Sequence, residues 1–220
     1  MQSGAATPGR DGTFAGLAAD VLAAPPRLGT TRLVGVDGPA GSGKTTFGRA
    51  LAAALGAPLV HMDDLYAGWT LVGAAARLSA GVLRPLAAGR PGAYHRYDWH
   101  AGAFSPDRVL VPVAAALVVE GCGSCPPALD RFSTLRVWVE APADLRLHRG
   151  IERDGAALRA EWQRWQQLEA AVFAAERTRD RADLRVDGAP AVPDVPGGFT
   201  VLGGGGPVTR LEHRGRTMEA

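Results

Sequence analysis

Lys44 is the only lysine in a 220-residue chain whose other 23 basic Lys and Arg positions are all arginine. It lies in the segment Gly38-Pro39-Ala40-Gly41-Ser42-Gly43-Lys44-Thr45, which matches the pattern G-x-x-x-x-G-K-[ST]. A compact ammonium on a flexible stem can bridge two phosphate groups inside a tight backbone loop, whereas a broad guanidinium cannot. The retained lysine therefore indicates a phosphate-binding loop, and the alternative is a glycine-rich turn that happens to precede a helix.

The sequence on either side of this segment supports the first interpretation. Residues 33–36 are typical of a buried parallel strand, and residues 47–55 of an apolar helix that ends at Gly56. A loop between such elements points successive backbone N–H groups and a helix N-terminus at an anion. We therefore predict that the phosphates of a nucleotide contact Gly38, Pro39, Ala40, Gly41, Ser42, Gly43, Lys44, Thr45 and Thr46.

Composition limits the other classes of function. The chain is 46% hydrophobic, which is enough for one compact domain, and its net charge is only +2, with basic residues interleaved with acidic ones. Such a pattern gives no reason to expect nucleic acid or an anionic membrane as a partner. The N-terminus lacks a basic leader, and the longest apolar run, residues 109–119, contains Pro112. We expect a cytoplasmic protein.

Short apolar segments alternate with helical ones along the chain. Strands are predicted at 33–36, 59–62, 116–119, 135–140 and 184–186, and helices at 13–24, 47–55, 71–88, 142–153 and 156–177. This alternation predicts an α/β fold with three layers around a parallel sheet, the architecture of P-loop NTPases. We assign residues 1–187 to one domain, with a lead-in helix at 13–24 and a lid at about 142–160. Residues 188–220, rich in Pro and Gly, are predicted to form a disordered tail.

Acidic residues follow two of the predicted strands. Because ligands bind at the carboxyl ends of parallel strands, Asp63, Asp64 and Glu120 are candidates for the site. Glu120 and Thr45 could hold Mg²⁺, and Asp63 could orient or deprotonate a hydroxyl. A solvated turn or a helix N-cap is the alternative, above all for Asp64. The single acid at 120 argues against ATP-driven motors, and the absence of Asn argues against small GTPases.

Cys122 and Cys125 form a lone C-x-x-C pattern. No further pair of ligands follows at the spacing of a zinc finger. A redox pair and a loop with two reduced thiols both remain open, and the second fits a cytosolic chain better.

With these motifs in order, residues 33–188 resemble the uridine kinase and pantothenate kinase branch of small-molecule kinases. The resemblance is carried by the phosphate-binding loop, Asp63-Asp64-Leu65-Tyr66, Tyr97-Asp98-Trp99, Glu120-Gly121 and the arginine-bearing stretch 146–153. It implies ATP and Mg²⁺ as cofactors, Asp63 as the general base, and an acceptor site that includes Tyr66, Tyr97, Asp98 and His100. His100 lies closer to Tyr97 than the family's base-contacting histidine does, which puts the pyrimidine specificity in doubt.

Arg146, Arg149 and Arg153 are spaced to share one face of a helix. Such a helix can close over a triphosphate and place guanidinium groups on the transferring phosphoryl group, a catalytic role for which we favour Arg149 and Arg153. The alternative is a solvated face paired with Asp144 and Glu152.

Aromatic residues divide into two groups. Trp162, Trp165, Leu168 and Phe173 recur at helical spacing, which predicts a stripe that faces the core. Trp69 and Trp99 fall in predicted loops near the acceptor, where their rings could stack on a substrate.

Taken together, these patterns predict an ATP-dependent kinase that phosphorylates a hydroxyl of a small molecule, above all a nucleoside. The alternatives are a kinase for another alcohol, such as a vitamin precursor or natural product, and a nucleotide-binding regulator without an acceptor. The acidic turn at Asp63 and the Tyr97-Asp98 segment favour an acceptor site. The acceptor's identity, the choice between ATP and GTP, and the oligomeric state stay open.

Overall fold

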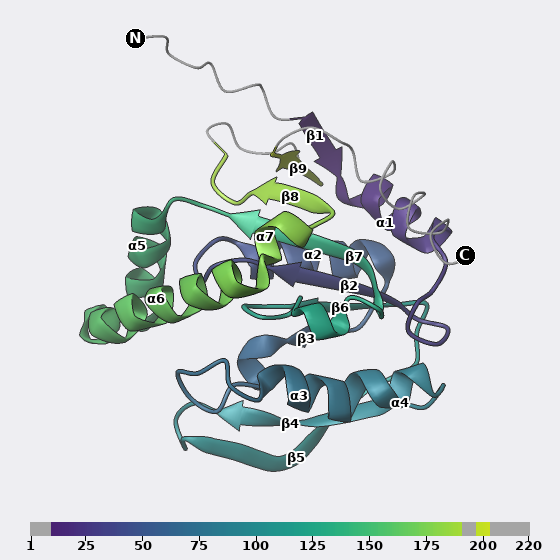
Figure 1. Cartoon of the computed structure of the whole chain (residues 1–220), viewed down its shortest axis with the longest axis horizontal. Coiled ribbons are helices and arrows are strands. Elements are labelled where there is room, and N and C mark those ends of the chain that lie inside the picture. Colours follow the sequence, from purple (N-terminus) through teal and green to yellow (C-terminus); the bar gives the residue numbers. More distant parts are fainter. Residues whose placement is uncertain (1–9, 191–196, 203–220) are drawn as a thin grey trace.

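A computed structural model of the chain describes residues 10–190 and 197–202, and Figure 1 shows their arrangement around a central sheet. Within these residues the sheet has seven strands in the order β1-β9-β8-β7-β2-β6-β3. Its strands are β1 (Arg10–Thr13), β2 (Arg32–Asp37), β3 (Leu59–His61), β6 (Ala116–Glu120), β7 (Ser133–Glu140), β8 (Leu184–Asp187) and β9 (Gly198–Val201).

Five adjacent strands of this sheet, β8, β7, β2, β6 and β3, are parallel, as the alternating pattern predicts. β2 lies at the centre, where Val34 is opposite Val118 of β6 and Leu135 of β7. β3 joins the far side of β6, and β8 joins β7, both in parallel. The carboxyl ends of these strands therefore meet at one edge of the sheet, where the predicted site residues are concentrated.

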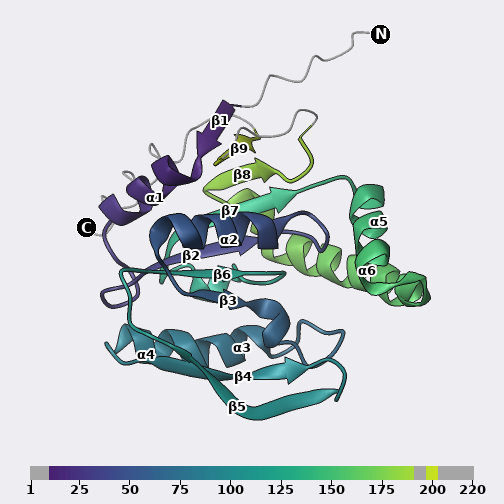
Figure 2. The ribbon, with the colours of Figure 1, turned by 180° about the vertical axis from the view of Figure 1, so that it is seen from behind.

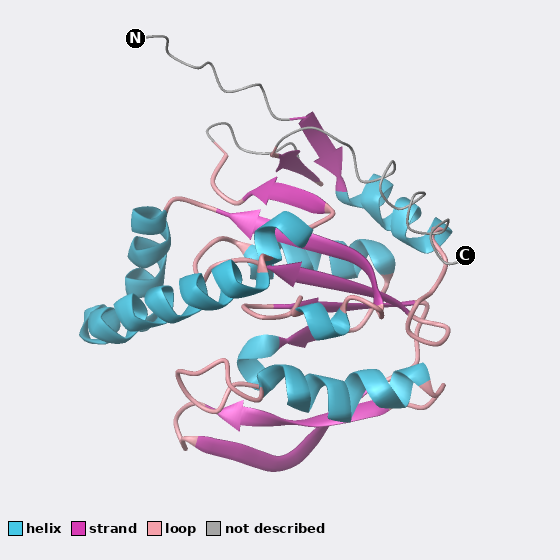
Figure 3. Cartoon of the chain, in the orientation of Figure 1, coloured by secondary structure: helices cyan, strands magenta, loops and turns pink. Residues whose placement is uncertain are grey.

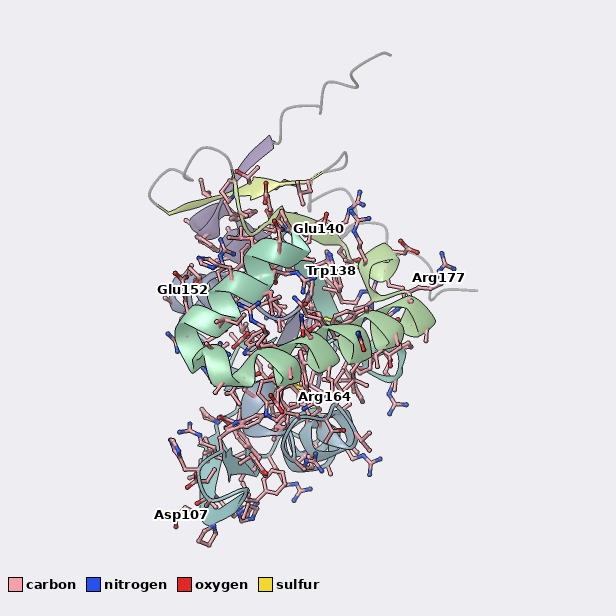
Figure 4. The ribbon with its side chains drawn as sticks, turned by 90° about the vertical axis from the view of Figure 1, so that its left-hand side faces the viewer. Asp107, Trp138, Glu140, Glu152, Arg164 and Arg177 are labelled. Atoms are coloured by element: carbon pink, nitrogen blue, oxygen red, sulfur yellow. The ribbon has the colours of Figure 1, made fainter. Side chains whose placement is uncertain are left out.

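Helices cover both faces of the sheet (Figure 3). On one face, seen in Figure 2, lie α1 (Phe14–Ala23) and α2 (Lys44–Leu55); on the other, seen in Figure 1, lie α6 (Arg159–Glu176) and α7 (Thr178–Arg181). Helix α5 (Ala143–Asp154) precedes α6 and lies against it, as Figure 4 shows with Glu152 labelled on α5 and Arg164 on α6. The predicted three-layer α/β architecture is confirmed.

Sequence signals set the ends of the two helices that flank the central strand. α1 begins where the Thr13 hydroxyl accepts a hydrogen bond from the Gly16 N–H, and it ends just before Pro25-Pro26. α2 ends at Gly56, which adopts a left-handed conformation with φ of 57°. Its buried residues Phe47 and Leu51 pack with α1 and the sheet in one of the two halves of the core.

A two-stranded hairpin lies beside the β3 edge, and the sequence reading missed it. Strands β4 (Gly92–Asp98) and β5 (Ala103–Val111) pair antiparallel, away from the main sheet. They pack against a helix predicted at 71–88, which the structure divides into α3 (Ala74–Leu78), a π-helical turn (Ser79–Leu83) and α4 (Arg84–Ala87). β5 is largely exposed, so its residues lack the apolar alternation that marks a half-buried strand.

The expectation of disorder from residue 188 onward is wrong for β9. Its residues pair antiparallel with β1, and Val201 also pairs with Val186 of β8. Phe199 is 3% exposed and contacts the rings of Phe14 and Phe47 at centroid distances of 5.1 and 5.2 Å. Four residues are too short for a clear periodic signal, so only tertiary pairing defines this strand. The rest of the predicted tail, 191–196 and 203–220, lies outside the described residues.

No helix among the described residues is long and apolar enough to cross a membrane.

The pairing of β9 with β1 predicts that a chain without β9 is less stable. A chain that ends at Gly188 should melt about 5 °C below one that ends at Leu202, because it loses the buried Phe199 side chain, which contributes about 2 kcal/mol. Thermal unfolding followed by circular dichroism measures the difference. Equal melting temperatures of the two chains would mean that β9 adds nothing to the stability of the fold.

Candidate active site

One cleft of ≈ 1120 Å³ runs along the carboxyl edge of the parallel strands. Its centre is formed by the predicted phosphate-binding loop and the start of α2. Predicted acceptor residues line one end, and aromatic residues from α1 and β9 line the other. Representative lining residues, in this order, are Lys44, Thr45, Asp63, Trp69, Trp99, Phe14 and Phe199.

Lys44 is the first residue of α2, and its side chain is buried beneath the loop. Its Nζ donates a hydrogen bond to the Pro39 carbonyl at 2.8 Å. Burial acts to lower the pKa of Lys44, but the acidic groups around it outweigh burial and hold that pKa above its ordinary value. The ammonium is therefore charged at neutral pH and is positioned for an anion above the loop.

Two glycines let the loop approach its neighbours closely. At Gly38, with φ of 141°, a Cβ atom would lie 2.1 Å from the Val139 carbonyl oxygen. At Gly41, with φ of 78°, it would lie 2.5 Å from the Arg146 carbonyl oxygen. Any other residue would push the loop away from β7 and α5, so these two positions require glycine.

A buried ion pair fixes the middle of the loop. Glu169 of α6 accepts a hydrogen bond from the Ala40 N–H at 2.8 Å, and Arg146 of α5 donates to its other carboxylate oxygen at 2.9 Å. Arg146 also donates to the Ala40 carbonyl at 3.3 Å. Glu169 is only 1% exposed, and this burial raises the pKa of its carboxyl. The Arg146 guanidinium group therefore stabilises the loop through these contacts.

The buried face of α6 differs from the predicted stripe at one position, where Glu169 is buried in place of Leu168. Trp162, Trp165 and Phe173 are buried as predicted, but Leu168 is 36% exposed and Glu169 takes its inward position. The sequence carried a signal for this, because 162, 165, 169 and 173 keep the helical spacing. A buried acid on an aromatic stripe requires a partner, and the partner comes from a distant part of the chain.

Asp37, the last residue of β2, joins the loop to the segment after β6. One of its oxygens accepts from the N–H groups of Gly38 and Gly123 at 2.8 and 2.9 Å, and the other from the N–H of Cys125 at 2.8 Å. Burial outweighs these bonds and raises the pKa of Asp37 to about 6. Sequence reasoning missed this residue, although its place directly before Gly38 was the available signal.

The candidate metal ligands lie together. The Thr45 hydroxyl is 3.2 and 3.3 Å from the two carboxylate oxygens of Glu120, at the start of α2 and the end of β6. No group of three or more His, Cys, Asp or Glu side chains in the described residues could hold a metal by itself. A hydroxyl and one carboxylate beside a phosphate cradle fit Mg²⁺, which keeps several waters and takes its other ligands from phosphates.

His61 is a further partner of Glu120 that the sequence reading did not single out. Its Nδ1 lies 2.5 Å from a Glu120 carboxylate oxygen. The hydrogen bond to Glu120 raises the pKa of His61, against the opposing effect of partial burial.

The two neighbouring acids after β3 have different surroundings. Asp63 lines the cleft, and the structure gives its carboxylate no hydrogen-bond partner among the described residues. Desolvation by the cleft walls and the nearby charge of Glu120 raise its pKa. Asp64 instead accepts from the Tyr94 hydroxyl at 2.9 Å and pairs with Arg96 at 3.1 Å, so it ties the β4–β5 hairpin to this turn.

Tryptophans form the wall next to Asp63. Trp69 contacts the rings of Trp99, Trp162 and Trp165 at centroid distances of 5.8, 6.2 and 5.9 Å, all edge to face. Trp99 also donates from its indole nitrogen to the Asp63 carbonyl at 3.3 Å. Trp69 and Trp99 are partly exposed, as expected of stacking candidates, while Trp162 and Trp165 line the cleft although both are buried.

The other predicted acceptor residues lie in different places. His100 lines the cleft, and so does Tyr66, whose hydroxyl is occupied by a hydrogen bond to the Cys122 carbonyl at 2.8 Å. Tyr97 and Asp98 are not among the lining residues. Asp98 is predicted to belong to the acceptor site, but one of its oxygens accepts hydrogen bonds from the His100 and Ala101 N–H groups and stabilises the hairpin turn. Tyr97 packs its ring against Trp99 and Phe104.

The predicted lid corresponds to α5 and the 3₁₀ turn Ala156–Leu158. Arg149 donates to the carbonyls of Gly41 and Gly188 at 3.1 and 3.0 Å, so it contacts the loop. Arg153 lines the cleft, pairs with Asp154, and lies over the Trp162 ring at 5.5 Å. Glu152, one of the acids named for the alternative of a solvated face, pairs with His148.

Cys122 and Cys125 are both free and buried. The Cys122 thiol contacts the Gly38 carbonyl and Glu169, and burial raises the pKa of both thiols well above the ordinary value. These observations agree with two reduced thiols that fill the space behind the loop.

Comparison with known proteins identifies solved structures that share this fold. No family model and no curated protein matches the chain. Solved structures do match: a possible uridine kinase from Bacillus stearothermophilus is 20% identical over 78% of this chain and 96% of its own, with a TM-score of 0.57. A candidate fructose transport system kinase from Silicibacter sp. TM1040 is 21% identical over 75% of this chain and 95% of its own, with a TM-score of 0.55.

The chain therefore has the three-layer P-loop NTPase fold, in the form found among kinase structures. The resemblance in sequence to the uridine kinase branch agrees with this likeness in structure.

The Glu169 ion pair yields a prediction with a matched control one residue away. Glu169→Ala should lower the free energy of unfolding by about 3 kcal/mol, because Arg146 is left as an uncompensated buried charge and Ala40 loses its acceptor. Leu168→Ala, at an exposed position of the same helix, should change it by about 0.5 kcal/mol or less. Urea denaturation measures both. Similar values for the two variants would show that the ion pair does not stabilise the loop.

Proposed function

We propose that this protein is an ATP-dependent kinase that transfers the γ-phosphoryl group to a hydroxyl of a small molecule, above all a nucleoside. The observation that carries the proposal is the position of Asp63. Its carboxylate has no protein partner among the described residues and opens into the same cleft as Lys44 and Thr45. A nucleotide-binding regulator without an acceptor has no use for such a group.

The phosphate-binding loop would hold the donor. Its backbone N–H groups and the charged Lys44 would bind the β- and γ-phosphates. The Glu169–Arg146 ion pair supports this role because it fixes the position of the loop. Thr45 and Glu120 would hold Mg²⁺, which when bound adds positive charge beside the phosphate oxygens. Because Glu169 and Arg146 hold the loop through contacts within the protein, little free energy would be needed to arrange it around a nucleotide.

Asp63 would orient the accepting hydroxyl and take its proton. A general base works best when its pKa lies close to the operating pH, and the raised pKa of Asp63 moves in that direction. The proton would leave the hydroxyl oxygen for an Asp63 carboxylate oxygen while that hydroxyl oxygen attacks the γ-phosphorus. The bond from the γ-phosphorus to the β,γ-bridging oxygen would break, and ADP would leave with that oxygen.

Arg149 and Arg153 would complete the site from α5. Arg149 is held between the phosphate-binding loop and the segment after β8, and Arg153 lines the cleft from the same helix. Guanidinium groups at these positions could neutralise the charge that spreads over the γ-phosphoryl oxygens in the transition state.

The walls of the acceptor end support a substrate with a flat ring. Trp69 and Trp99 present aromatic surface beside Asp63, and His100 adds a polar group at the rim. A nucleoside combines a stacking base with a primary hydroxyl and fits these walls better than a polyol without a ring system does. Another ring-bearing alcohol is the principal competitor.

Lys44 provides the first test of this function. Lys44→Ala should reduce turnover by about 10²–10³-fold, because the γ-phosphoryl charge loses a buried cation. Lys44→Arg should not restore activity, since the loop has no room for a guanidinium. Steady-state kinetics measure both, with unfolding curves as a check on the fold. Near-normal turnover by Lys44→Arg would remove the explanation for the retained lysine.

The second test identifies the acceptor and its base together. Wild-type protein with radiolabelled ATP is screened against nucleosides, vitamins and sugars, and a phosphorylated nucleoside is expected. With that acceptor, Asp63→Asn should lower kcat by about 100-fold or more and leave ATP binding nearly unchanged. Asp64→Asn is the matched control and should act on stability more than on kcat, because Asp64 holds the hairpin. No labelled product from any acceptor would contradict the proposed activity.

A further inference from the structure

We propose that the two terminal segments of the described chain, α1 with β1 and β9, form an aromatic subsite for the base of the donor nucleotide. This inference rests on the proposed function and deepens its donor side. The residues that would form the subsite are Phe14, Phe47, Ala50 and Phe199, all of which line the cleft beyond Thr46. Phe14 and Phe199 lie outside the region 33–188 that resembles known kinases.

The position of the subsite follows from the direction of the cleft. Asp63, Trp69 and Trp99 define the acceptor end, and Lys44 with the loop occupies the centre. A nucleotide whose γ-phosphate points at Asp63 must extend its base away from that end. The wall it reaches there is made by the start of α1, the second turn of α2 and the residues of β9.

The chemistry of this wall suits a flat aromatic ring. Phe14, Phe47 and Phe199 form a mutual cluster with centroid distances of 5.1, 5.1 and 5.2 Å. Phe14 is only partly buried, so its ring offers free surface to the cleft. Stacking and edge-to-face contacts with such rings stabilise aromatic ligands, whereas a bare phosphate chain gains nothing from them.

The subsite depends on the pairing of two segments far apart in sequence. Gly12 pairs with Phe199, and the Phe14 N–H donates to the Gly197 carbonyl at 2.9 Å. A Cβ atom at Gly12 would lie 2.5 Å from the Phe199 ring, so glycine leaves the space that this ring fills. A base that contacts Phe14 and Phe199 therefore contacts β9 and the residue that directly follows β1, and its binding should stabilise the pairing of these two strands.

The experiment compares ATP with inorganic tripolyphosphate, which carries the phosphates and no base. Dissociation constants of both are measured by calorimetry for wild type, Phe14→Ala and Ala50→Leu. The first variant removes aromatic surface, and the second fills the cleft without removing a core side chain. Each should weaken ATP about tenfold and leave tripolyphosphate unchanged. Leu22→Ala, at an exposed position of α1 outside the cleft, is the matched control and should change neither.

Hydrogen exchange gives a second readout that does not require a variant. ATP should slow exchange of the backbone amides in β1 and β9 more than tripolyphosphate does. Equal protection by the two ligands, or an unchanged ratio of their dissociation constants in both Phe14→Ala and Ala50→Leu, would overturn the subsite and leave the kinase proposal intact. Failure of the wild type to bind ATP at all would instead count against the proposed function.

Discussion

The buried ammonium of Lys44 is the constraint on which the rest of the site depends. A charge held away from water must be compensated, and it must also stay available to an anion that arrives later. The structure meets both needs by surrounding Lys44 with acidic groups that raise its pKa, while its Nζ donates a hydrogen bond to one acceptor among the described residues, the carbonyl of Pro39 in its own loop. Backbone N–H groups directed at one point repel one another electrostatically. The loop therefore needs contacts with the rest of the protein to keep its conformation.

The residue just before the loop and three distant parts of the chain, namely the segment after β6, α6 and α5, support the loop. Asp37 accepts N–H groups of the loop and of the segment after β6, and Glu169 accepts the Ala40 N–H from α6. Arg146 joins Glu169 to α5, the helix that also carries Arg149 and Arg153. Arg146 and Arg149 also donate directly to carbonyls of the loop. A change in the position of α5 would therefore move the loop both through these hydrogen bonds and through the ion pair with Glu169.

The cleft combines elements with different structural roles. Its centre is made by the ends of parallel strands, which the sheet fixes rigidly, whereas its two ends are made by segments added at opposite edges of that sheet. The β4–β5 hairpin and the turn after β3 border the acceptor end, and β1, α1 and β9 border the other. Under the proposed function, the rigid strands would position phosphoryl transfer, while the added segments would determine which molecules fit beside it.

The sequence by itself determined the elements whose signals are local. A G-x-x-x-x-G-K-[ST] loop between a strand and a helix specifies its own backbone, and apolar periodicity specified the five parallel strands and most helices. Tertiary structure alone decided what depends on contacts between distant residues. It paired β9 with β1, turned Glu169 inward in place of Leu168, and committed Asp98 to a hairpin turn and not to the cleft. A short strand, a buried acid and a turn-capping carboxylate all acquire their roles from partners that no local pattern can identify.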